Sequence, residues 1–533
     1  MEISSWIITI LIISTIHGIC TWKLYLKANR QAWEAFIPVY NGIVMMQIVN
    51  RPKWWILLLF IPIINLLILP VIWIETLRTF GKKTTADMWL GIVSLGLYIG
   101  YVNYTQEVTY IEKRDTKPAT KALDTLGSLS FALIVATFVH TYFIQPFVIP
   151  TSSLEKTLLV GDFLFVSKFH YGARTPITTV AAPMVHDTIP VIKTKSYLER
   201  PQLPYFRFPG FQKIERNDIV VFNWPTDTLY HMYKNADKKY YKPIDKKTNY
   251  VKRCTAIPGD KLEIKNGILF INGKESILPE RSKVQYSYKI AFDNTVENIG
   301  SYLEQALVET ESTDGFRTNE TKDTLIVAAL TKAGAEKFKS ITGVKSVEKI
   351  IATTSEDGIF PDFRDGNAPK NRNWNLDNMG PIYIPEAGKT VALNKETLPF
   401  YKMIITEYEH HKLEVNGNEI KIDGKPATSY TFAQNYYWMM GDNRHNSLDA
   451  RYFGFTPEDH IVGKPIFIWM SFDIDNRLGK PFLDRFRTDR FFTTVSGDGE
   501  PQSYFKYFLI ALAGYFAWDW YRGKKKKKEA ETL

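Results

Sequence analysis

The sequence predicts a mainly β, antiparallel domain that carries an inserted α+β subdomain, together with several transmembrane α-helices. Three observations predict this organisation. Alternating apolar residues flank Asn-Gly pairs in 261–273 and 412–424, which is the pattern of β-hairpins. Long apolar stretches of membrane-spanning length occur near both ends of the chain. Between the hairpins, 304–349 shows helical periodicity and 360–380 is rich in Asp, Asn, Pro and Gly, as an insert with long loops would be.

Length and composition exclude several classes of protein. The 533 residues exceed one ordinary domain, and 45% hydrophobic with 14% aromatic residues can fill a core as well as membrane helices, so we expect two or three domains. The net charge of +10 includes the lysine run 524–528 beside an apolar segment, which indicates a membrane surface rather than nucleic acid. Cys20 and Cys254 offer neither a disulfide framework nor a zinc pattern, and the nine histidines are scattered, so no metal site is expected.

The N-terminal apolar segments are predicted to be membrane helices. Residues 3–22 lack a basic leader and a small-residue cleavage site, so we predict a retained helix. A second span is predicted at 54–74, where Pro62 and Pro70 leave open whether the segment crosses, kinks or turns back. A third span is predicted at 88–104.

A further anchor is predicted at 126–147 and a last helix at 503–521. Lys and Arg concentrate in 23–53, in 105–125 and in the tail after Trp520, and such loops are retained in the cytoplasm. Residues 151–502 are therefore predicted to be exported. The predicted order is an N-terminal multi-helix membrane module (1–107), the anchor (126–147), the β domain's first part (148–264), the insert (265–430), the β domain's second part (431–475), a linker (476–502), the C-terminal transmembrane helix (503–521) and a basic cytoplasmic tail (522–533).

Three polar blocks carry the candidate chemistry. Block 150–158 has a serine pair just after the anchor, block 250–260 places Lys252 in an apolar strand before a Pro-Gly-Asp turn, and block 439–454 is densely polar. A serine hydroxyl is a weak nucleophile until a base takes its proton, and burial lowers a lysine pKa by up to ~3–5 units. Lys252 is therefore a candidate base, the alternative being an exposed lysine paired with a carboxylate. Ser447 either satisfies a turn or orients this amine.

These blocks resemble the ordered boxes of bacterial type I signal peptidases, which are Ser/Lys dyad peptidases. The blocks read Ser-Ser-Leu-x-x-Thr-Leu, Lys-Arg-x-x-x-x-Pro-Gly-Asp and Gly-Asp-Asn-Arg-x-Asn-Ser-x-Asp-x-Arg-x-x-Gly. Residues 216–222 resemble a fourth box between the first two. The resemblance covers about 126–470 and is interrupted by the insert. The long third block is the most specific signal.

The resemblance implies a role for each matching residue. The nucleophile falls on Ser153 and the general base on Lys252. The oxyanion hole falls on the backbone N–H of Ser153 and the hydroxyl of Thr151, and Ser447 matches the serine that orients the base. A structural role in supporting the site is implied for four polar residues, Asp442, Arg444, Asp449 and Arg451.

Three positions depart from the family pattern. Leu154 replaces a usual Met and keeps its volume, so it should be tolerated. Lys156 replaces a usual Pro, which removes a rigid turn beside the nucleophile and adds a charge; we expect an altered substrate preference rather than lost activity. Asn217 stands where the family commonly has Gly.

The implied function is that of a membrane-bound signal peptidase, a serine endopeptidase that removes N-terminal signal peptides from secreted preproteins without a metal or organic cofactor. Its expected partners are these preproteins and the lipid bilayer, with the export machinery as a candidate and without nucleic acid. The implied location is the bacterial inner membrane, multi-pass, with the catalytic domain on the exported side. One alternative is a catalytically silent scaffold that binds exported proteins, which the retained Ser153 and Lys252 disfavour. Another is a relative of soluble Ser/Lys self-cleaving repressors, which the predicted membrane helices disfavour.

Overall fold

The protein forms two compact units. The computed structural model describes residues 3–115, 121–229, 239–293, 315–318, 323–361, 373–476, 479–497 and 499–531. One unit comprises Met1–Ile144, Arg174–Phe208 and Thr228–Lys247, and the other comprises Gln145–Ala173, Pro209–Asp227 and Thr248–Leu533. Parts of the predicted insert, at 294–314, 319–322 and 362–372, lie outside the described residues.

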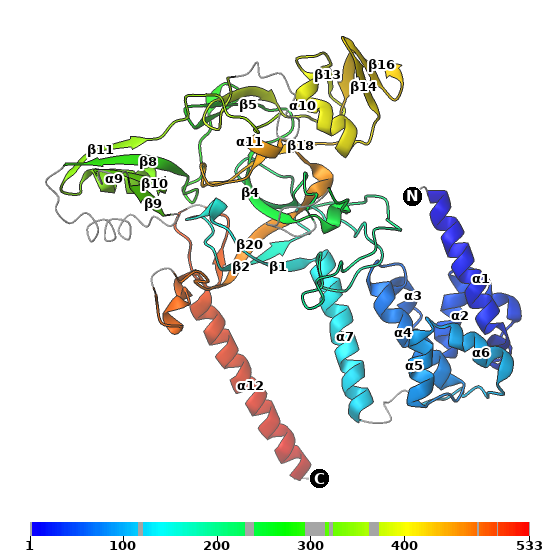
Figure 1. Ribbon diagram of the computed structural model, residues 1–533. Helices are drawn as coiled ribbons and strands as arrows, with labels where there is room; N and C mark the ends of the chain where they lie inside the picture. Colours follow the sequence, from blue (N-terminus) through cyan, green and yellow to red (C-terminus); the bar gives the residue numbers. More distant parts are fainter. Residues whose placement is uncertain are drawn as a thin grey trace. The chain divides into compact units, whose positions relative to one another are not determined.

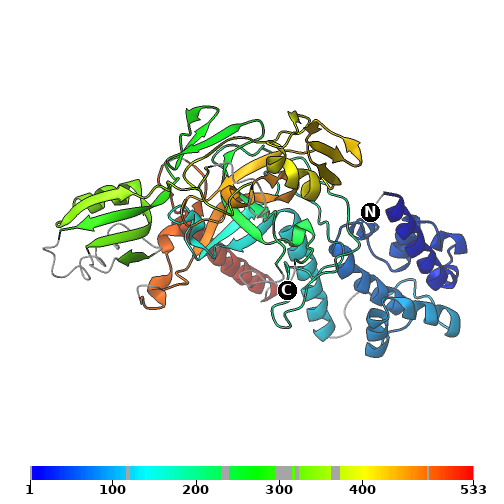
Figure 2. The ribbon, with the colours of Figure 1, turned by 45° about the horizontal axis from the view of Figure 1, so that its top comes forward.

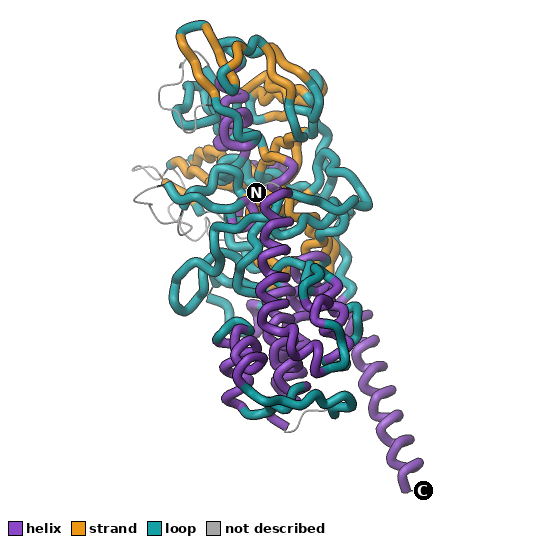
Figure 3. The backbone as a smooth tube through the Cα atoms, turned by 90° about the vertical axis from the view of Figure 1, so that its right-hand side faces the viewer, coloured by secondary structure: helices purple, strands orange, loops and turns teal. Residues whose placement is uncertain are grey.

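The first unit is helical over its N-terminal part, drawn in purple in Figure 3. Its helices are α1 (Ile3–Lys27), α2 (Tyr40–Ile48), α3 (Trp55–Leu58), α4 (Ile64–Thr79), α5 (Thr85–Val93), α6 (Leu97–Thr105) and α7 (Lys121–Tyr142). Buried side chains from successive helices form one core, among them Leu24, Val44, Ile68 and Ile99. Removing these apolar side chains from water holds the short helices together, because helices of nine residues are marginal alone.

Two predicted membrane spans are broken. Segment 54–74 forms α3 and α4, which are separated where Ile63 takes a φ of 70°, directly after Pro62. Segment 88–104 forms α5 and α6, which are separated at Gly96 with a φ of 86°. Residues in the left-handed region cannot continue an α-helix, so neither segment is one continuous helix.

The other predicted spans are helical in α1, in α7 and in α12 (Phe505–Glu531). Among the helices of the described residues, however, none is both long enough and apolar enough to cross a membrane. The prediction of several transmembrane helices is therefore not supported by the structure.

The second unit is built around a curled antiparallel sheet, visible near the centre of Figure 1. Its strands in spatial order are β1 (Ile144–Val148), β2 (Asp162–Ser167), β20 (Ile461–Ser471), β3 (Ile219–Asn223), β4 (Asn249–Ala256), β18 (Tyr436–Met440) and β19 (Thr456–Pro457), and β21 (Thr493–Thr494) also pairs with β20. The core beneath it includes Leu154, Leu164, Val221 and Ile468. The predicted mainly β, antiparallel architecture is confirmed.

Strand pairing brings the polar blocks together. Val220 on β3 lies opposite Lys252 on β4, and Arg253 lies opposite Met440, the last residue of β18. The third block begins directly after that residue. The pairing therefore sets the start of the third block beside the second block, although about 190 residues of chain separate them.

Both predicted hairpins are present. Lys265 pairs with Ile268 around the turn Asn266–Gly267, and Asn416 pairs with Glu419. The first hairpin belongs to a sheet of β12 (Met379–Tyr383), β5 (Lys261–Lys265), β6 (Ile268–Ile271) and β7 (Lys274–Glu275). The second belongs to a sheet of β14 (Leu413–Asn416), β15 (Glu419–Ile422) and β16 (Lys425–Pro426), near the pair β13 (Thr390–Ala392) and β17 (Ser429–Thr431) in sequence.

A separate small sheet lies in the region predicted to be an insert. Its strands in order are β11 (Val344–Lys349), β8 (Gln285–Phe292), β10 (Thr324–Thr331) and β9 (Phe316–Thr318), seen as yellow-green arrows in Figure 2. Helix α9 (Lys332–Lys339) packs Ala335 and Phe338 into the core of this sheet. The helical periodicity predicted over 304–349 is realised by α9 within the described residues. The other described α-helices of this unit are the short helices α10 (Leu398–Met403) and α11 (Ala450–Phe453) and the long helix α12.

Candidate active site

The predicted nucleophile and base lie in direct contact. Ser153 sits in a short 3-10 turn, η2 (Ser152–Leu154), and Lys252 lies in β4. Lys252 Nζ donates a hydrogen bond of 2.5 Å to Ser153 Oγ. Ser153 is 8% exposed and Lys252 is 4% exposed. The chain thus places an amine and a hydroxyl together in a site from which most water is excluded.

The environment of Lys252 favours its neutral form. The pKa of Lys252 is lowered from its usual 10.5 to about 8, chiefly by burial; the positive charge of Arg451 acts in the same direction, and the charges of Asp449 and Asp442 oppose the shift. Desolvation disfavours the ammonium because the protein interior cannot solvate the charge as water does. A neutral amine at 2.5 Å from a hydroxyl can accept its proton.

The turn that carries Ser153 is held by the third polar block. The backbone N–H of Asn443 donates to the Ser153 carbonyl at 3.1 Å, and its side-chain amide donates to the Ser152 carbonyl at 3.3 Å. The Asn446 amide donates to Ser152 Oγ at 3.2 Å. These bonds fix the orientation of η2 relative to the loop after β18. Both asparagines are site residues whose role the sequence did not reveal beyond their place in the motif.

Gly441 permits this close approach. A Cβ atom at Gly441 would lie 2.2 Å from Ser447 Oγ and 2.6 Å from the Ser153 carbonyl oxygen. Both separations are far below van der Waals contact, so any larger residue would push the turn and Ser447 apart. The glycine therefore brings the predicted nucleophile's backbone and Ser447 to the same point.

Ser447 is buried, but it does not bond to Lys252. It is 9% exposed, and its Oγ has no hydrogen-bond partner within the described part of the chain. The base-orienting hydrogen bond expected from the resemblance is thus absent from this structure, although Ser447 lies beside the pair. A buried hydroxyl without a hydrogen-bond partner lowers the stability of the fold, so its presence is better explained by a functional role than by a structural one.

Thr151, the predicted oxyanion donor, directly precedes η2. It has extended backbone angles, is exposed, and makes no side-chain hydrogen bond to the backbone of that turn. Its hydroxyl is therefore not consumed in capping η2.

Asp442 anchors the site through Arg253, the residue after Lys252 in β4. Arg253 donates to both carboxylate oxygens of Asp442, at 2.7 and 2.6 Å, and to the Asn217 carbonyl at 2.8 Å. Thr157 Oγ1 donates to the same carboxylate at 2.7 Å. Burial would raise the pKa of Asp442, but the charge and hydrogen bonds of Arg253 hold it below its ordinary value. Successive side chains of a strand point to opposite faces, so Arg253 and Lys252 reach different partners from β4.

Asp449 and Arg451 form a second buried pair. Two hydrogen bonds of 2.9 and 2.8 Å join them, and Asp449 Oδ2 also accepts from the Gly441 N–H at 3.0 Å. Arg451 Nη2 donates to the Arg444 carbonyl at 2.5 Å, which closes the loop between β18 and α11. Burial lowers the pKa of the Arg444 guanidinium, and its Nε has no partner among the described residues.

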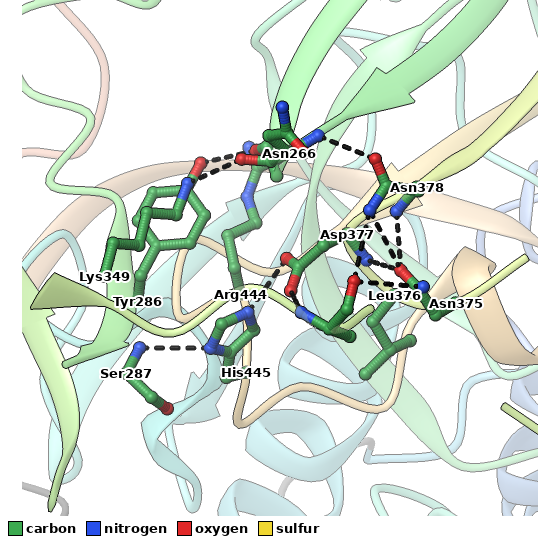
Figure 4. A network of polar contacts seen from close by, with 12 residues as sticks. Asn266, Tyr286, Ser287, Lys349, Asn375, Leu376, Asp377, Asn378, Arg444 and His445 are labelled. Carbon is green, nitrogen blue, oxygen red and sulfur yellow. Dashed lines mark hydrogen bonds and ion pairs between the residues drawn. The ribbon is translucent and has the colours of Figure 1, made fainter. Parts of the chain in front are cut away.

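Figure 4 shows that Ser287 and Asp377, from the region predicted to be an insert, contact the same loop at His445. The Ser287 N–H donates to His445 Nδ1 at 3.0 Å, so the ring proton lies on Nε2, which bonds to Asp377 at 2.9 Å. Burial would raise the pKa of Asp377, but the His445 and Ala352 hydrogen bonds lower it. Neither Ser287 nor Asp377 belongs to a polar block, so no sequence signal identified them.

Two departures from the family pattern have a structural explanation. Lys156 has a φ of 70°, which a proline ring cannot adopt, so the turn after the nucleophile takes a different path from one built on proline. Asn217 has a φ of 71°, and Asn and Gly are the residues that tolerate this region best. The usual Gly and this Asn therefore serve the same backbone conformation.

Comparison with known proteins identifies the family of the chain. The family described as "Signal peptidase, peptidase S26" matches residues 122–328 and 384–470, more than half of the chain. A family of unknown function (DUF5684) matches residues 33–113.

Curated relatives named "Signal peptidase I" match over about 70% of the chain. The Buchnera aphidicola (subsp. Acyrthosiphon pisum) protein is 28% identical, over 70% of this chain and 81% of its own length. The Haemophilus influenzae protein is 24% identical, over 72% and 79%. The Rickettsia typhi protein is 22% identical, over 72% and 98%. The chain belongs to the signal peptidase family, peptidase S26.

Proposed function

We propose that this chain is a serine endopeptidase that cleaves signal peptides from preproteins, with Ser153 as nucleophile and Lys252 as general base. The observation that carries the proposal is the 2.5 Å contact between a buried amine of lowered pKa and a buried hydroxyl. Membership of the signal peptidase family supports the reaction and the substrate class.

In the first step, the Ser153 oxygen attacks the carbonyl carbon of the scissile peptide bond while Lys252 Nζ takes the hydroxyl proton. The negative charge that develops on the carbonyl oxygen is stabilised by donors aimed at it, an effect worth ~2.7–4 kcal/mol per donor. We assign this role to the Ser153 N–H and the Thr151 hydroxyl. An exposed hydroxyl that does not cap η2 supports the assignment of Thr151.

In the second step, the C–N bond breaks as the Lys252 ammonium returns the proton to the leaving amine, which leaves an acyl group on Ser153. A water molecule, deprotonated by the neutral Lys252, then attacks this ester. The C–O bond to Ser153 breaks as the Lys252 ammonium returns the proton to Ser153 Oγ, which releases the carboxylic acid and regenerates the serine. One base of intermediate pKa can serve in both directions, because it exchanges its proton readily near neutral pH.

The remaining polar residues are proposed to position the pair. Asp442 with Arg253, and Asp449 with Arg451, hold the loop that backs η2. Ser447 is proposed to orient Lys252 once substrate is bound, since catalytic hydrogen bonds often tighten only in the complex. That the lipid bilayer and the export machinery are partners, and that the catalytic part faces the exported side of an inner membrane, stay predictions from the sequence.

The proposal is tested by a preprotein cleavage assay with Ser153→Ala and Lys252→Met. Each variant should lower kcat by ~10³-fold or more, and the double variant should be no worse than either alone, because the two residues act as one unit. Folding is checked by circular dichroism. Full activity in either folded variant would remove the dyad, and an inactive wild type that still binds preproteins would favour a silent scaffold.

A further inference from the structure

Three arginines of the N-terminal helical unit converge on one buried carboxylate. Glu75 in α4 is 4% exposed. Arg51, which follows α2, pairs with it at 2.9 Å, Arg78 in α4 pairs with it at 3.1 Å, and Arg114 pairs with it through Nη2. Three positive charges against one negative charge leave two in excess within this cluster.

Arg114 also holds donors that no described residue satisfies. Its side chain is 4% exposed, and its Nε and Nη1 atoms are buried without a hydrogen-bond partner in the part of the chain that the structure describes. A guanidinium offers five N–H donors in a fixed fork. Orphaned donors on a buried cation are rare in native proteins and point to an ion or water that completes the group.

A purely structural role explains this arrangement poorly. One arginine on Glu75 would already neutralise the carboxylate, as Arg30 does for Glu34 in the same unit. Each further buried cation adds desolvation cost and repels the other guanidiniums. Glu112, two residues before Arg114, is exposed. The second and third arginines are therefore not needed to neutralise Glu75.

The cluster is assembled from three separate segments. The stretch that carries Arg114 returns along the helices, where the Ile111 N–H donates to the Thr79 carbonyl at 3.0 Å and the Asn50 amide donates to the Glu112 carbonyl at 2.6 Å. The side chains of Arg51 and Arg78 are 26% and 16% exposed. These two arginines connect the buried carboxylate with solvent and form the open side of the cluster.

We propose that Arg51, Arg78 and Arg114 form an anion site for a phosphate group, either free or in a lipid headgroup. Guanidinium forks match the geometry of phosphate oxygens, and a phosphate supplies both the missing acceptors and the missing negative charge. The site lies in the region that matches a family of unknown function, apart from Arg114 just beyond it, and it does not depend on the roles proposed for Ser153 and Lys252.

The full-length protein is tested with two probes. Thermal unfolding is followed while inorganic phosphate is added at constant ionic strength, with chloride as the reference salt. Co-sedimentation is measured with phosphatidylcholine vesicles with and without phosphatidylglycerol. A melting temperature that rises with phosphate identifies a free anion, and sedimentation that requires phosphatidylglycerol identifies a headgroup. Either result would support recognition of a phosphate group by the three arginines.

Variants assign the effect to the cluster. Arg51→Gln, which alters a partly exposed residue and should fold, is expected to weaken phosphate or vesicle binding about tenfold, the loss typical of one charge-assisted hydrogen bond. Arg114→Gln should weaken it at least as much. Glu75→Gln should strengthen binding, because it raises the surplus from two charges to three. Arg30→Gln, which breaks a one-to-one pair in the same unit, is the matched control and should leave binding unchanged.

Tighter phosphate or vesicle binding in Glu75→Gln distinguishes a ligand site from an ion-pair network that only holds the helices together. Such a network predicts that Glu75→Gln lowers stability and does not tighten binding. If wild type responds to neither probe, or if Arg51→Gln and Arg114→Gln respond like Arg30→Gln, the site does not exist.

Discussion

Lys252 combines a catalytic advantage with a cost in stability. Its pKa is about 8 in the folded protein and near 10.5 when exposed. The unfolded chain therefore binds more protons between these two values, so stability rises with pH across that window. Below pH 8 the lysine is protonated in both states, and the buried charge destabilises the fold by about 3 kcal/mol.

Lys252→Met should therefore abolish cleavage and yet raise the free energy of unfolding at pH 7, by up to about 3 kcal/mol. The variant should also lose the rise in stability between pH 8 and 10.5. In the wild type, kcat should increase with pH through about 8, as the base loses its proton. Urea unfolding at several pH values and a pH–rate profile measure these effects. A variant less stable than wild type at pH 7 would contradict the assigned environment.

Replacing Ser447 should affect activity more than stability, unlike the replacement of a serine with a structural role. Its Oγ is buried beside Gly441 and has no hydrogen-bond partner among the described residues, so Ser447→Ala should change stability little. If Ser447 orients Lys252 in the substrate complex, the same variant should lower kcat about tenfold or more with little change in KM. Ser152→Ala is the comparison for a structural loss, because it removes the hydrogen bond from Asn446 that helps to hold η2. Unchanged kcat in Ser447→Ala would limit Ser447 to filling space.

The contribution of the sequence differs from residue to residue. Ser153 and Lys252 could be proposed from two polar blocks, because the chemistry of a serine nucleophile requires a desolvated base. The partner of Asp442 could not, since the polar blocks contain several Lys and Arg residues and only the pairing of β4 with β18 places Arg253 beside it. Asp377 could not be predicted as the partner of His445, because it lies outside the polar blocks in a region without a recognisable motif.

At the scale of elements, sequence patterns predicted structure correctly where the pairing partners are close in the chain. Both hairpins followed from alternating residues around Asn-Gly, since their pairing is local. The order of strands in the main sheet was not predictable, because β20 lies between β2 and β3 although it follows them by some 240 residues or more. The segments 54–74 and 88–104 are each divided, at Ile63 and at Gly96, where left-handed backbone interrupts an apolar run. The prolines of 54–74 had left a kink open as one possibility, whereas the composition of 88–104 gave no sign of the break.

The Arg253–Asp442 pair joins β4 to the loop after β18, and its energy can be separated from its position. Arg253→Met should lower the free energy of unfolding by about 3–5 kcal/mol, because it leaves a carboxylate buried without its cation. The double variant Arg253→Met with Asp442→Leu should recover much of this loss, since it buries no charge. Recovery should be partial, because Thr157 also donates to Asp442.

Urea unfolding of the two single variants and the double variant measures this coupling. Cleavage should remain weak in the double variant even where stability returns, because the apolar pair cannot reproduce the bidentate geometry that holds the loop. A double variant as unstable as the sum of the single variants would mean that the two residues act independently.

At the scale of the whole molecule, the two units have separate cores. Leu24, Val44 and Ile99 belong to the core of the N-terminal helices, whereas Leu154 and Val221 belong to the core beneath the main sheet. Every residue to which a catalytic role is assigned lies in the second unit. Residues 1–115 therefore contribute no side chain to the proposed reaction.

A chain that lacks residues 1–115 should accordingly cleave a short soluble peptide substrate with kcat/KM within about threefold of the full-length value, a difference below 1 kcal/mol in transition-state stabilisation. The same deletion combined with Lys252→Met provides the inactive control. The truncated chain should also lose the response to phosphate, because it lacks Arg51, Arg78 and Arg114. Loss of peptide cleavage by a truncated protein that remains folded would show that the N-terminal helices support the active site itself. Retained cleavage with a retained phosphate response would place anion binding outside the arginine cluster.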